Sequence, residues 1–295
     1  LLKKAQHTAF GNHYGFPDIL DDSNFEQAFR NRVPVFDYNQ MYDQWWHRTL
    51  EGQLDISWKG RVKYFALSSG TTGASSKYIP VTLDMMRAMR QTALRMFACL
   101  PAYNPSPDIY TKEWLMIGGS ASLEDLGHAY AGDLSGINAR KPPLWVRKFY
   151  RPGTQIAKLK NWDQRVAAIT KEAHKWDIGV IVGIPSWVQL TLESIVNHYQ
   201  VDNIHQIWPN LEVFVSGGIA FEPYRKSFER LLDKPLVYQD SYLASEGFVA
   251  YQSRPEAKGM KLALNSGIYF EFIPFTEDNF ADDGSIKENP TILTI

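Results

Sequence analysis

The chain has 295 residues, of which 44% are hydrophobic and 14% aromatic. This composition can bury a large core and argues against a disordered chain. The 31 Lys and Arg residues nearly balance the 32 Asp and Glu residues, which leaves a formal net charge of -1. Bulk electrostatics therefore give no reason to expect a nucleic acid partner, and any anion site must be local.

The single cysteine, Cys99, lies in an apolar helical stretch and has no partner for an internal disulfide. We expect it to pack in the core, which fits a reducing, cytoplasmic location. The longest apolar stretch, residues 178–188, contains Gly179, Gly183 and Pro185. It is far shorter than the roughly 20 residues of a membrane span, so no membrane partner is expected.

The ends of the sequence favour a fragment of a longer protein. The chain begins at Leu1 in a segment without an apolar signal core, and residues 290–295 (PTILTI) predict a strand that has no partner in view. Pro and Gly are scattered rather than gathered in a linker. We therefore expect residues 1–295 to form one domain.

The first third of the chain predicts helices, then two strands around a Gly-rich loop. The ranges are helices 25–31 and 39–50 and strands 61–67 and 78–81. A long helix follows, capped by Thr82 and ended by Pro101. Its core stripe is expected at helical spacing on Met85, Met89, Ala93, Met96 and Leu100.

The remainder alternates strands with helices, which predicts an α/β fold. The strands are expected at residues 114–117, 178–182, 211–215 and 236–238, and the helices at 162–176, 186–197 and 223–232. A loop is expected at 240–247. In such folds ligands gather at the carboxyl ends of the strands, where the loops after Leu67, Val215 and Tyr238 are candidates.

The strongest local motif is residues 67–82, LSSGTTGASSKYIPVT. Glycine frees the backbone to bind anions through its N–H groups, while hydroxyls and a lysine add donors and charge. A polyphosphate would suit this loop, and the alternative is a Ser/Gly surface loop. Ser76 precedes the lysine and a strand follows, which excludes a Walker loop. The residues concerned are Ser68, Ser69, Gly70, Thr71, Thr72, Gly73 and Lys77.

A second motif, residues 242–247 (YLASEG), follows a predicted strand end. There Glu246 could hold Mg²⁺ and Ser245 could reach a phosphate oxygen. Taken alone, Glu246 is more typical of a solvated loop acid. Glu246 becomes a stronger candidate because its motif follows the Gly-rich loop in the chain.

Two further segments follow strands. In residues 215–221 (VSGGIAF), the backbone of Gly217 and Gly218 could approach an adenine face, although an ordinary tight turn is the alternative. Residues 183–187 (GIPSW) could line an acyl pocket, although a core tryptophan is commoner. No zinc spacing occurs, and residues 118–122 and 278–284 lack the hydrolase-elbow and EF-hand patterns.

Together these motifs resemble the auxin-responsive Gretchen Hagen three family of acyl acid amido synthetases, a branch of the adenylate-forming ligases. SSGTTGASSKYIPVT resembles its phosphate loop, GIPSW and SGGIAFEPY its central segments, and YLASEG its second nucleotide motif. The resemblance implies the large amino-terminal domain of a firefly-luciferase-like ligase, with mixed sheets flanked by helices. The small carboxyl-terminal domain would be absent.

The resemblance also implies a reaction: ATP adenylates a small carboxylic acid, and an amino acid amine then displaces AMP to form an amide. It assigns catalysis to Lys77 and Glu246, Mg²⁺ to Glu246, and the acyl pocket to Pro185, Trp187 and Phe221. The nucleotide set comprises the phosphate-loop residues above with Gly217, Gly218, Tyr242, Ala244, Ser245 and Glu246.

The sequence departs from the family in two respects. The later Tyr-Arg-x-Gly-Asp motif is missing, and the phosphate loop has Thr72, Gly73, Ser75 and Ser76 where plant hormone-conjugating members have an SSGTSAGERK-like form. The acid and the amine therefore stay open, as does the oligomeric state. Transfer of the acyl group to coenzyme A, or a binding module without turnover, are the alternatives.

Overall fold

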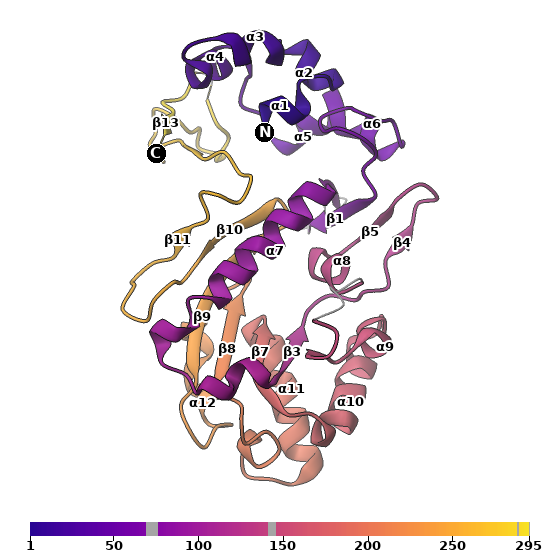
Figure 1. The fold of residues 1–295 in the computed structure, drawn as a ribbon, viewed down its shortest axis with the longest axis vertical. Coiled ribbons are helices and arrows are strands. Elements are labelled where there is room, and N and C mark those ends of the chain that lie inside the picture. The colour runs from indigo at the N-terminus through magenta and orange to yellow at the C-terminus, as the bar shows by residue number, and fades with distance from the viewer. Residues whose placement is uncertain (69–75, 141–145, 288, 295) are drawn as a thin grey trace.

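The structure, a computed structural model, describes residues 1–68, 76–140, 146–287 and 289–294. Two mixed sheets flanked by helices form most of it, and a group of short helices lies at one end (Figure 1). This architecture agrees with the predicted α/β class.

The larger sheet has seven strands in the order β11-β10-β9-β8-β7-β3-β6. The five from β6 to β9 run parallel, and β10 and β11 run antiparallel at one side. The strands are β3 (Glu113–Ile117), β6 (Tyr150–Arg151), β7 (Ile178–Gly183), β8 (Val213–Gly217), β9 (Val237–Ala244), β10 (Gly247–Tyr251) and β11 (Lys261–Leu262).

The smaller sheet has the order β2-β1-β5-β4, so β2 is an edge strand. Its strands are β1 (Tyr64–Ser68), β2 (Lys77–Val81), β4 (Glu124–Asp125) and β5 (Tyr130–Gly132). A third, two-stranded sheet pairs β12 (Glu271–Phe272) with β13 (Leu293–Thr294). The expectation that residues 290–295 form a strand without a partner is therefore wrong: the partner lies about twenty residues upstream.

Short helices precede the sheets: α1 (Leu2–Ala5), α2 (Ala9–His13), α3 (Phe16–Asp21), α4 (Phe25–Arg32), α5 (Tyr38–Met41) and α6 (His47–Leu50). A π-helical turn, Tyr42–Trp46, joins α5 to α6, so the predicted helix 39–50 is present but not uniform. The later helices are α7 (Leu83–Phe97), α8 (Leu134–Arg140), α9 (Thr154–Ala157), α10 (Trp162–Glu172), α11 (Pro185–Tyr199) and α12 (Arg225–Glu229). None of the helices in the described ranges is long and apolar enough to cross a membrane.

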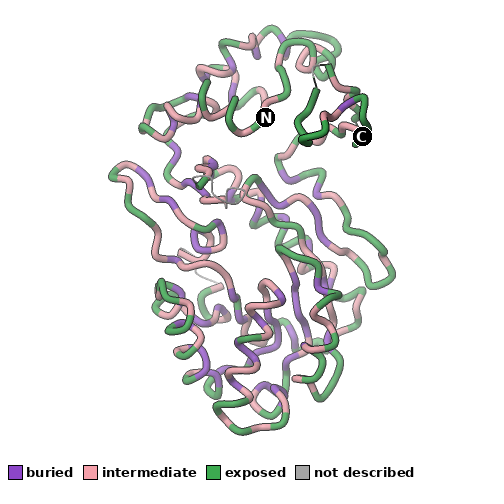
Figure 2. Tube along the Cα trace, turned by 180° about the vertical axis from the view of Figure 1, so that it is seen from behind, coloured by how far each residue is buried: buried purple, intermediate pink, exposed green. Residues whose placement is uncertain are grey.

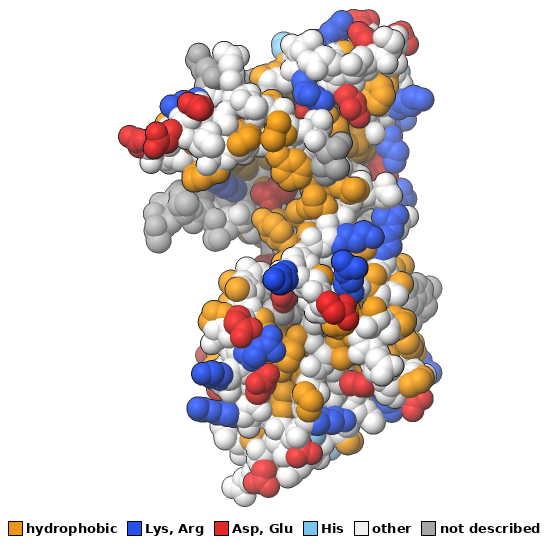
Figure 3. All heavy atoms as spheres, turned by 90° about the vertical axis from the view of Figure 1, so that its left-hand side faces the viewer, with side chains coloured by type: hydrophobic (Ala, Val, Ile, Leu, Met, Phe, Trp, Pro, Cys, Tyr) orange, Lys and Arg blue, Asp and Glu red, His pale blue; other side chains and the backbone are white. Residues whose placement is uncertain are grey.

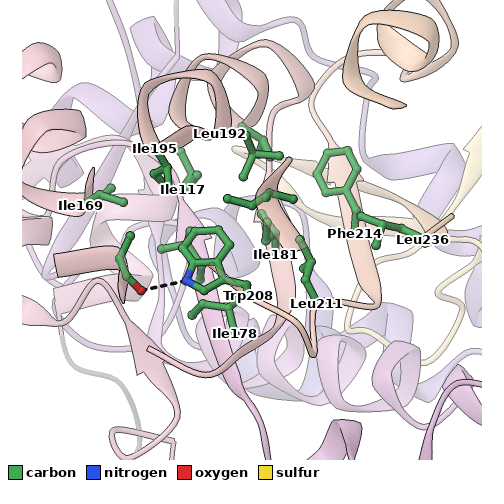
Figure 4. Packing of buried hydrophobic residues seen from close by; sticks show 14 of the residues in the cluster. Ile117, Ile169, Ile178, Ile181, Leu192, Ile195, Trp208, Leu211, Phe214 and Leu236 are labelled. Atoms are coloured by element: carbon green, nitrogen blue, oxygen red, sulfur yellow. Dashed lines mark hydrogen bonds between the residues drawn. The ribbon is translucent and has the colours of Figure 1, made fainter. Parts of the chain in front are cut away.

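Buried residues follow the strands of the larger sheet (Figure 2). Nonpolar residues of β7 and β8 pack there against α10 and α11. The indole N–H of Trp208, a fully buried residue, donates to the carbonyl of Ala173 at 2.9 Å (Figure 4). Because its N–H has an acceptor, this large ring fills the core without leaving a buried donor unpaired.

Helix α7 begins as predicted, because the Thr82 hydroxyl accepts a hydrogen bond from the N–H of Met85 at 3.1 Å. Met89 and Met96 are buried, but Ala93 is exposed and Thr92 is buried in its place. The buried face is therefore rotated by one residue at this turn. The Thr92 hydroxyl is satisfied by donating to the carbonyl of Ala88 at 3.0 Å.

The expected loop at 240–247 is wrong. Strand β9 continues to Ala244, and Gly247 pairs with Ala244 to start β10, so Ser245 and Glu246 form the turn of a β-hairpin. The second predicted motif therefore lies on a strand and a tight turn, which fix its backbone more firmly than a loop does.

His205 is a buried histidine held as a neutral ring. Its Nδ1 accepts a hydrogen bond from the N–H of Asp233 at 3.1 Å, and its Nε2 donates to the carbonyl of Leu211 at 3.1 Å. Burial lowers the pKa of His205 below its ordinary value of 6.5. Protonation of Nδ1 would place two donors face to face.

This arrangement predicts acid sensitivity. Because the pKa is lower in the folded state, stability from His205 is present above the unfolded pKa and is lost as the pH falls through the folded pKa. We expect His205→Gln to flatten the fall in the free energy of unfolding between about pH 7 and about pH 5. Urea unfolding at several pH values measures it. His7→Gln, at an exposed position, is the control and should keep the wild-type slope.

Candidate functional site

The carboxyl ends of β3, β7, β8 and β9 lie at one edge of the larger sheet. Ile117 pairs with Gly183, Gly183 with Ser216, and Gly217 with Ser241. In Figure 1 the arrows of β3, β7 and β8 point toward the middle of the molecule, and Figure 3 shows a deep notch at that height. Parallel α/β sheets bind ligands at such an edge.

Gly218, just after β8, touches the loop after β7. Its φ is +84°, a conformation that favours glycine, and a Cβ atom there would lie 3.2 Å from Cγ1 of Ile184. Gly218 and the next two residues are exposed. The structure therefore brings the predicted SGG and GIP segments together and leaves the glycine backbone accessible.

Gly217 approaches β9 just as closely. A Cβ atom on it would lie 2.8 Å from Oγ of Ser241, and that hydroxyl donates to the carbonyl of Ser216 at 2.9 Å. A larger residue would have to displace this hydrogen bond. The glycine thus permits the close approach of two neighbouring strand ends.

Beyond Ser241, the hairpin projects past the end of β8. Tyr242 is 54% exposed, Glu246 is exposed, and Ala244 and Ser245 are half-buried. An exposed aromatic ring and an exposed carboxylate are thus held on a hydrogen-bonded hairpin that starts beside Gly217. The ring offers a face for stacking and the carboxylate an oxygen ligand for a cation.

The ends of the predicted phosphate loop lie on the smaller sheet. Ser68 ends β1 and pairs with Lys77, which begins β2, so the antiparallel pair closes the loop at its base. The Lys77 ammonium lies 5.0 Å from the centroid of the Tyr38 ring. The other predicted loop residues, Ser69, Gly70, Thr71, Thr72 and Gly73, lie outside the described residues.

The predicted acyl-pocket residues lie in less open surroundings. Pro185 is buried in the first turn of α11, and Trp187 packs partly against the core, 5.0 Å from the Trp162 ring. Phe221 is only 4% exposed and contacts Phe228 in the core. Core packing explains the position of Phe221, which makes it the weakest of the three candidates.

Charged and aromatic side chains from β9 and from the segment after β8 contact one another near this edge. The Arg225 guanidinium sits over the Tyr238 ring at 4.7 Å and pairs with Glu222 at 2.8 Å. Burial raises the pKa of Tyr238 to about 12, so its hydroxyl stays neutral. Burial also raises the pKa of Asp240, against the opposing effect of Arg225.

The loop after β3 belongs to the same edge, which the sequence analysis missed. The N–H of Gly119 donates to the Ser135 hydroxyl at 2.7 Å, and the buried Arg165 donates to the carbonyl of Gly118 at 2.7 Å. Two consecutive glycines after a strand are the sequence feature that could have indicated this loop.

Clusters of possible metal ligands and surface hollows also bear on the candidate site. In the described ranges, no group of three or more His, Cys, Asp or Glu side chains is placed to hold a metal ion. Two hollows of about 630 Å³ and 770 Å³ border α10, and no predicted site residue lines either. Among the described residues, Glu246 therefore has no two further His, Cys, Asp or Glu side chains placed to share a cation with it.

Comparison with known proteins finds solved structures with a similar fold. The chain matches the AtGH3.15 acyl acid amido synthetase in complex with 2,4-DB with a TM-score of 0.69 at 14% identity, covering 92% of this chain and 56% of that one. A second GH3.15 acyl acid amido synthetase structure matches with a TM-score of 0.67 at 12% identity and the same coverage. An open conformation of 2-hydroxyisobutyryl-CoA ligase, in complex with 2-HIB-AMP and CoA, matches with a TM-score of 0.52 at 11% identity, covering 89% and 56%. No curated protein matches the chain.

The fold is therefore that of the amino-terminal domain of adenylate-forming ligases, as predicted. Residues 1–118 match the model of the GH3 family N-terminal domain, which confirms the predicted resemblance. The chain spans 56% of the length of these solved structures. At this identity, the structural likeness beyond residue 118 is one of fold.

The contact between Gly218 and Ile184 predicts a measurable difference between two glycines. Gly60 has nearly the same φ, +86°, but a Cβ atom there would meet nothing within 4 Å. We expect Gly60→Ala to lower the free energy of unfolding by about 1 kcal/mol through backbone strain, and Gly218→Ala to lower it further through crowding. Urea unfolding measures both.

Ile184→Ala removes the crowded atom, so it should recover the additional loss in the Gly218→Ala background. Equal destabilisation by the two alanine substitutions, with no effect of Ile184→Ala on their difference, would contradict the close contact between these loops.

Proposed function

We propose that the chain binds MgATP at the carboxyl edge of the larger sheet and is the amino-terminal part of an acyl acid amido synthetase. The observation that carries this proposal is the contact between three predicted segments, through Gly218 with Ile184 and Gly217 with Ser241. The fold of the adenylate-forming ligases supports it. We treat residues 1–295 as one nucleotide- and acyl-binding unit.

The described residues fit a nucleotide in three ways. The backbone of Gly218 is exposed in a conformation without a side chain, which suits close approach of a flat ring. The half-exposed Tyr242 ring offers a stacking face on the adjacent strand. Lys77 supplies a positive charge at the base of the phosphate loop, beside the hydroxyl-bearing Ser68.

Glu246 fits Mg²⁺ as a single carboxylate ligand. Mg²⁺ keeps several waters and is commonly held by one or two carboxylates together with substrate phosphates, rather than by a full protein cage. Ser245, next to Glu246 in the turn, would then reach a phosphate oxygen.

The proposed chemistry follows from charge and leaving-group ability. A carboxylate is a poor electrophile. Its attack on the α-phosphorus of ATP releases pyrophosphate and forms an acyl adenylate, from which an amine can displace AMP, a good leaving group. The chain's residues would hold the two anions together and offset their repulsion, which is a positioning and electrostatic task. Lys77 would compensate phosphate charge, while Pro185 and Trp187 would bound the acyl side.

Transfer to coenzyme A is the competing second step. The likeness to a ligase solved with 2-HIB-AMP and CoA favours it, although that match is weaker than the match to the amido synthetase. Both share the adenylation half-reaction, so the first test addresses that half-reaction and the second addresses the acceptor.

Substitution of the two charged site residues tests the first half-reaction. In the full-length protein, we expect Lys77→Ala and Glu246→Ala each to reduce acid-dependent exchange of pyrophosphate into ATP at least about tenfold, because each removes an interaction with phosphate charge that strengthens in the transition state. The unfolding midpoint should hardly change, since Lys77 is half-buried and Glu246 is exposed.

The matched controls are Lys258→Ala and Glu256→Ala, which remove the same charges from exposed positions outside the site. Both should retain wild-type exchange. Exchange that is unchanged in Lys77→Ala and in Glu246→Ala would refute the assignment of these residues.

Trapping identifies the acceptor. In a reaction with ATP and a panel of small carboxylic acids, we expect AMP release to rise on addition of amino acids and the product to be an amide, detected by mass spectrometry. AMP release that responds to coenzyme A alone, with a thioester product, would instead establish the acyl-CoA alternative. The absence of acid-dependent exchange with any acid would contradict adenylation itself.

A further inference from the structure

Lys77 occupies an unusual position for a surface lysine. It begins the edge strand β2, is half-buried, and places its ammonium 5.0 Å from the centroid of the Tyr38 ring. Among the residues that the structure describes, no carboxylate forms an ion pair with it. An aromatic face therefore holds this cation where a carboxylate would be the common partner.

Tyr38 is itself fixed from two sides. Its hydroxyl accepts a hydrogen bond from the N–H of Tyr78 at 2.8 Å, and its ring stacks on Tyr42 with centroids 5.8 Å apart. The first contact ties the ring to the residue directly after Lys77. Tyr38 thus touches β2 through both its hydroxyl and its ring.

The helix that carries Tyr38 is anchored in turn. Asp37 and Gln40 form a capping box, in which the Asp37 carboxylate accepts from the Gln40 N–H at 2.7 Å and the Gln40 side chain accepts from the Asp37 N–H at 3.0 Å. The π-helical turn that follows leads into α6, which packs against β2. Single π-helical turns are frequent at functional sites.

We infer that Tyr38 is a positioning residue for Lys77, holding its ammonium at the base of the phosphate loop while leaving its charge available to an anion. This inference rests on the proposed function, because it gives Lys77 a phosphate to meet. It adds to the nucleotide site a residue that lies 39 positions upstream of Lys77 in the chain.

The physical reason lies in the difference between a ring and a carboxylate as partner. A ring face attracts a cation through its quadrupole without carrying an opposite net charge. A carboxylate would compete with phosphate for the same ammonium. Burial raises the pKa of Tyr38, so the hydroxyl stays neutral and adds no negative charge beside Lys77.

Two substitutions separate the parts of Tyr38. Tyr38→Leu removes the ring, and Tyr38→Phe removes only the hydroxyl. In protein with ¹³C-methylated lysines, the Lys77 signal, assigned with Lys77→Arg, should show an upfield ring-current shift. We expect Tyr38→Leu to abolish this shift and Tyr38→Phe to keep most of it. Tyr110→Leu, at an exposed tyrosine elsewhere, is the control and should leave the shift unchanged.

Nucleotide binding provides the functional readout. MgATP affinity, measured by titration calorimetry, should fall about 2- to 5-fold in Tyr38→Leu, the range expected for an exposed cation–π contact, and should change less in Tyr38→Phe. In the background of Lys77→Ala the effect of Tyr38→Leu should disappear, because the ring then has no cation to position.

The outcomes distinguish this inference from the proposed function. A Lys77 signal that is the same in wild type and Tyr38→Leu overturns the inference, whatever nucleotide binding shows. A signal that shifts as expected, combined with MgATP affinity that is indifferent to Lys77→Ala, contradicts the phosphate role of Lys77 in the proposed function. It also overturns the part of the inference that assigns Tyr38 to the nucleotide site.

Discussion

Parallel pairing of β7, β8 and β9 is the constraint on which the site depends. Gly183 pairs with Ser216, and Gly217 pairs with Ser241, so segments separated by some thirty residues in the chain end at the same level. Pairing in register fixes the strand ends, but it does not by itself let the loops beyond them touch. Glycine at positions 217 and 218 allows these loops to touch, because side chains there would meet Ser241 and Ile184.

The second constraint is that the two sheets share one core. Ile79 and Val81 of β2 belong to the same buried cluster as Phe248 and Tyr251 of β10, and Met89 of α7 is a further member of it. Helix α7 packs along β10 (Figure 1). Strand β2 begins at Lys77 and strand β10 follows the turn at Glu246, so both charged residues extend from strands rooted in common packing. A well-packed core holds both residues in fixed positions, as the proposed binding of one ligand by residues of different sheets would require.

The elements with a strong pattern could be predicted from the sequence, and those set by long-range pairing could not. Helix α7 starts at a capped Thr82, and β7 is an apolar run before Gly183, so local rules suffice for both. Strand β9 extends to Ala244 because β10 pairs with it, and no local feature of YLASEG indicates that partner. In the same way β13 needs β12, and the burial of Thr92 in place of Ala93 follows from the exact direction in which α7 faces the sheet.

The same distinction applies to the candidate site, where local sequence predicts some features and only the tertiary structure reveals others. Lys77 illustrates this distinction. Its residue type and its place in a Ser/Gly loop predict an anion partner, whereas the tyrosine ring that holds it comes from a helix that only the tertiary structure brings to β2. On a chain with a net charge of -1, an anion site cannot rely on a general positive field. It needs individual cations whose charge is not cancelled by a neighbouring acid. A lysine held by an aromatic face meets that requirement, although the ring binds the ammonium more weakly than a carboxylate would. Because β2 is an edge strand, the ring can reach this lysine from the open side of the sheet.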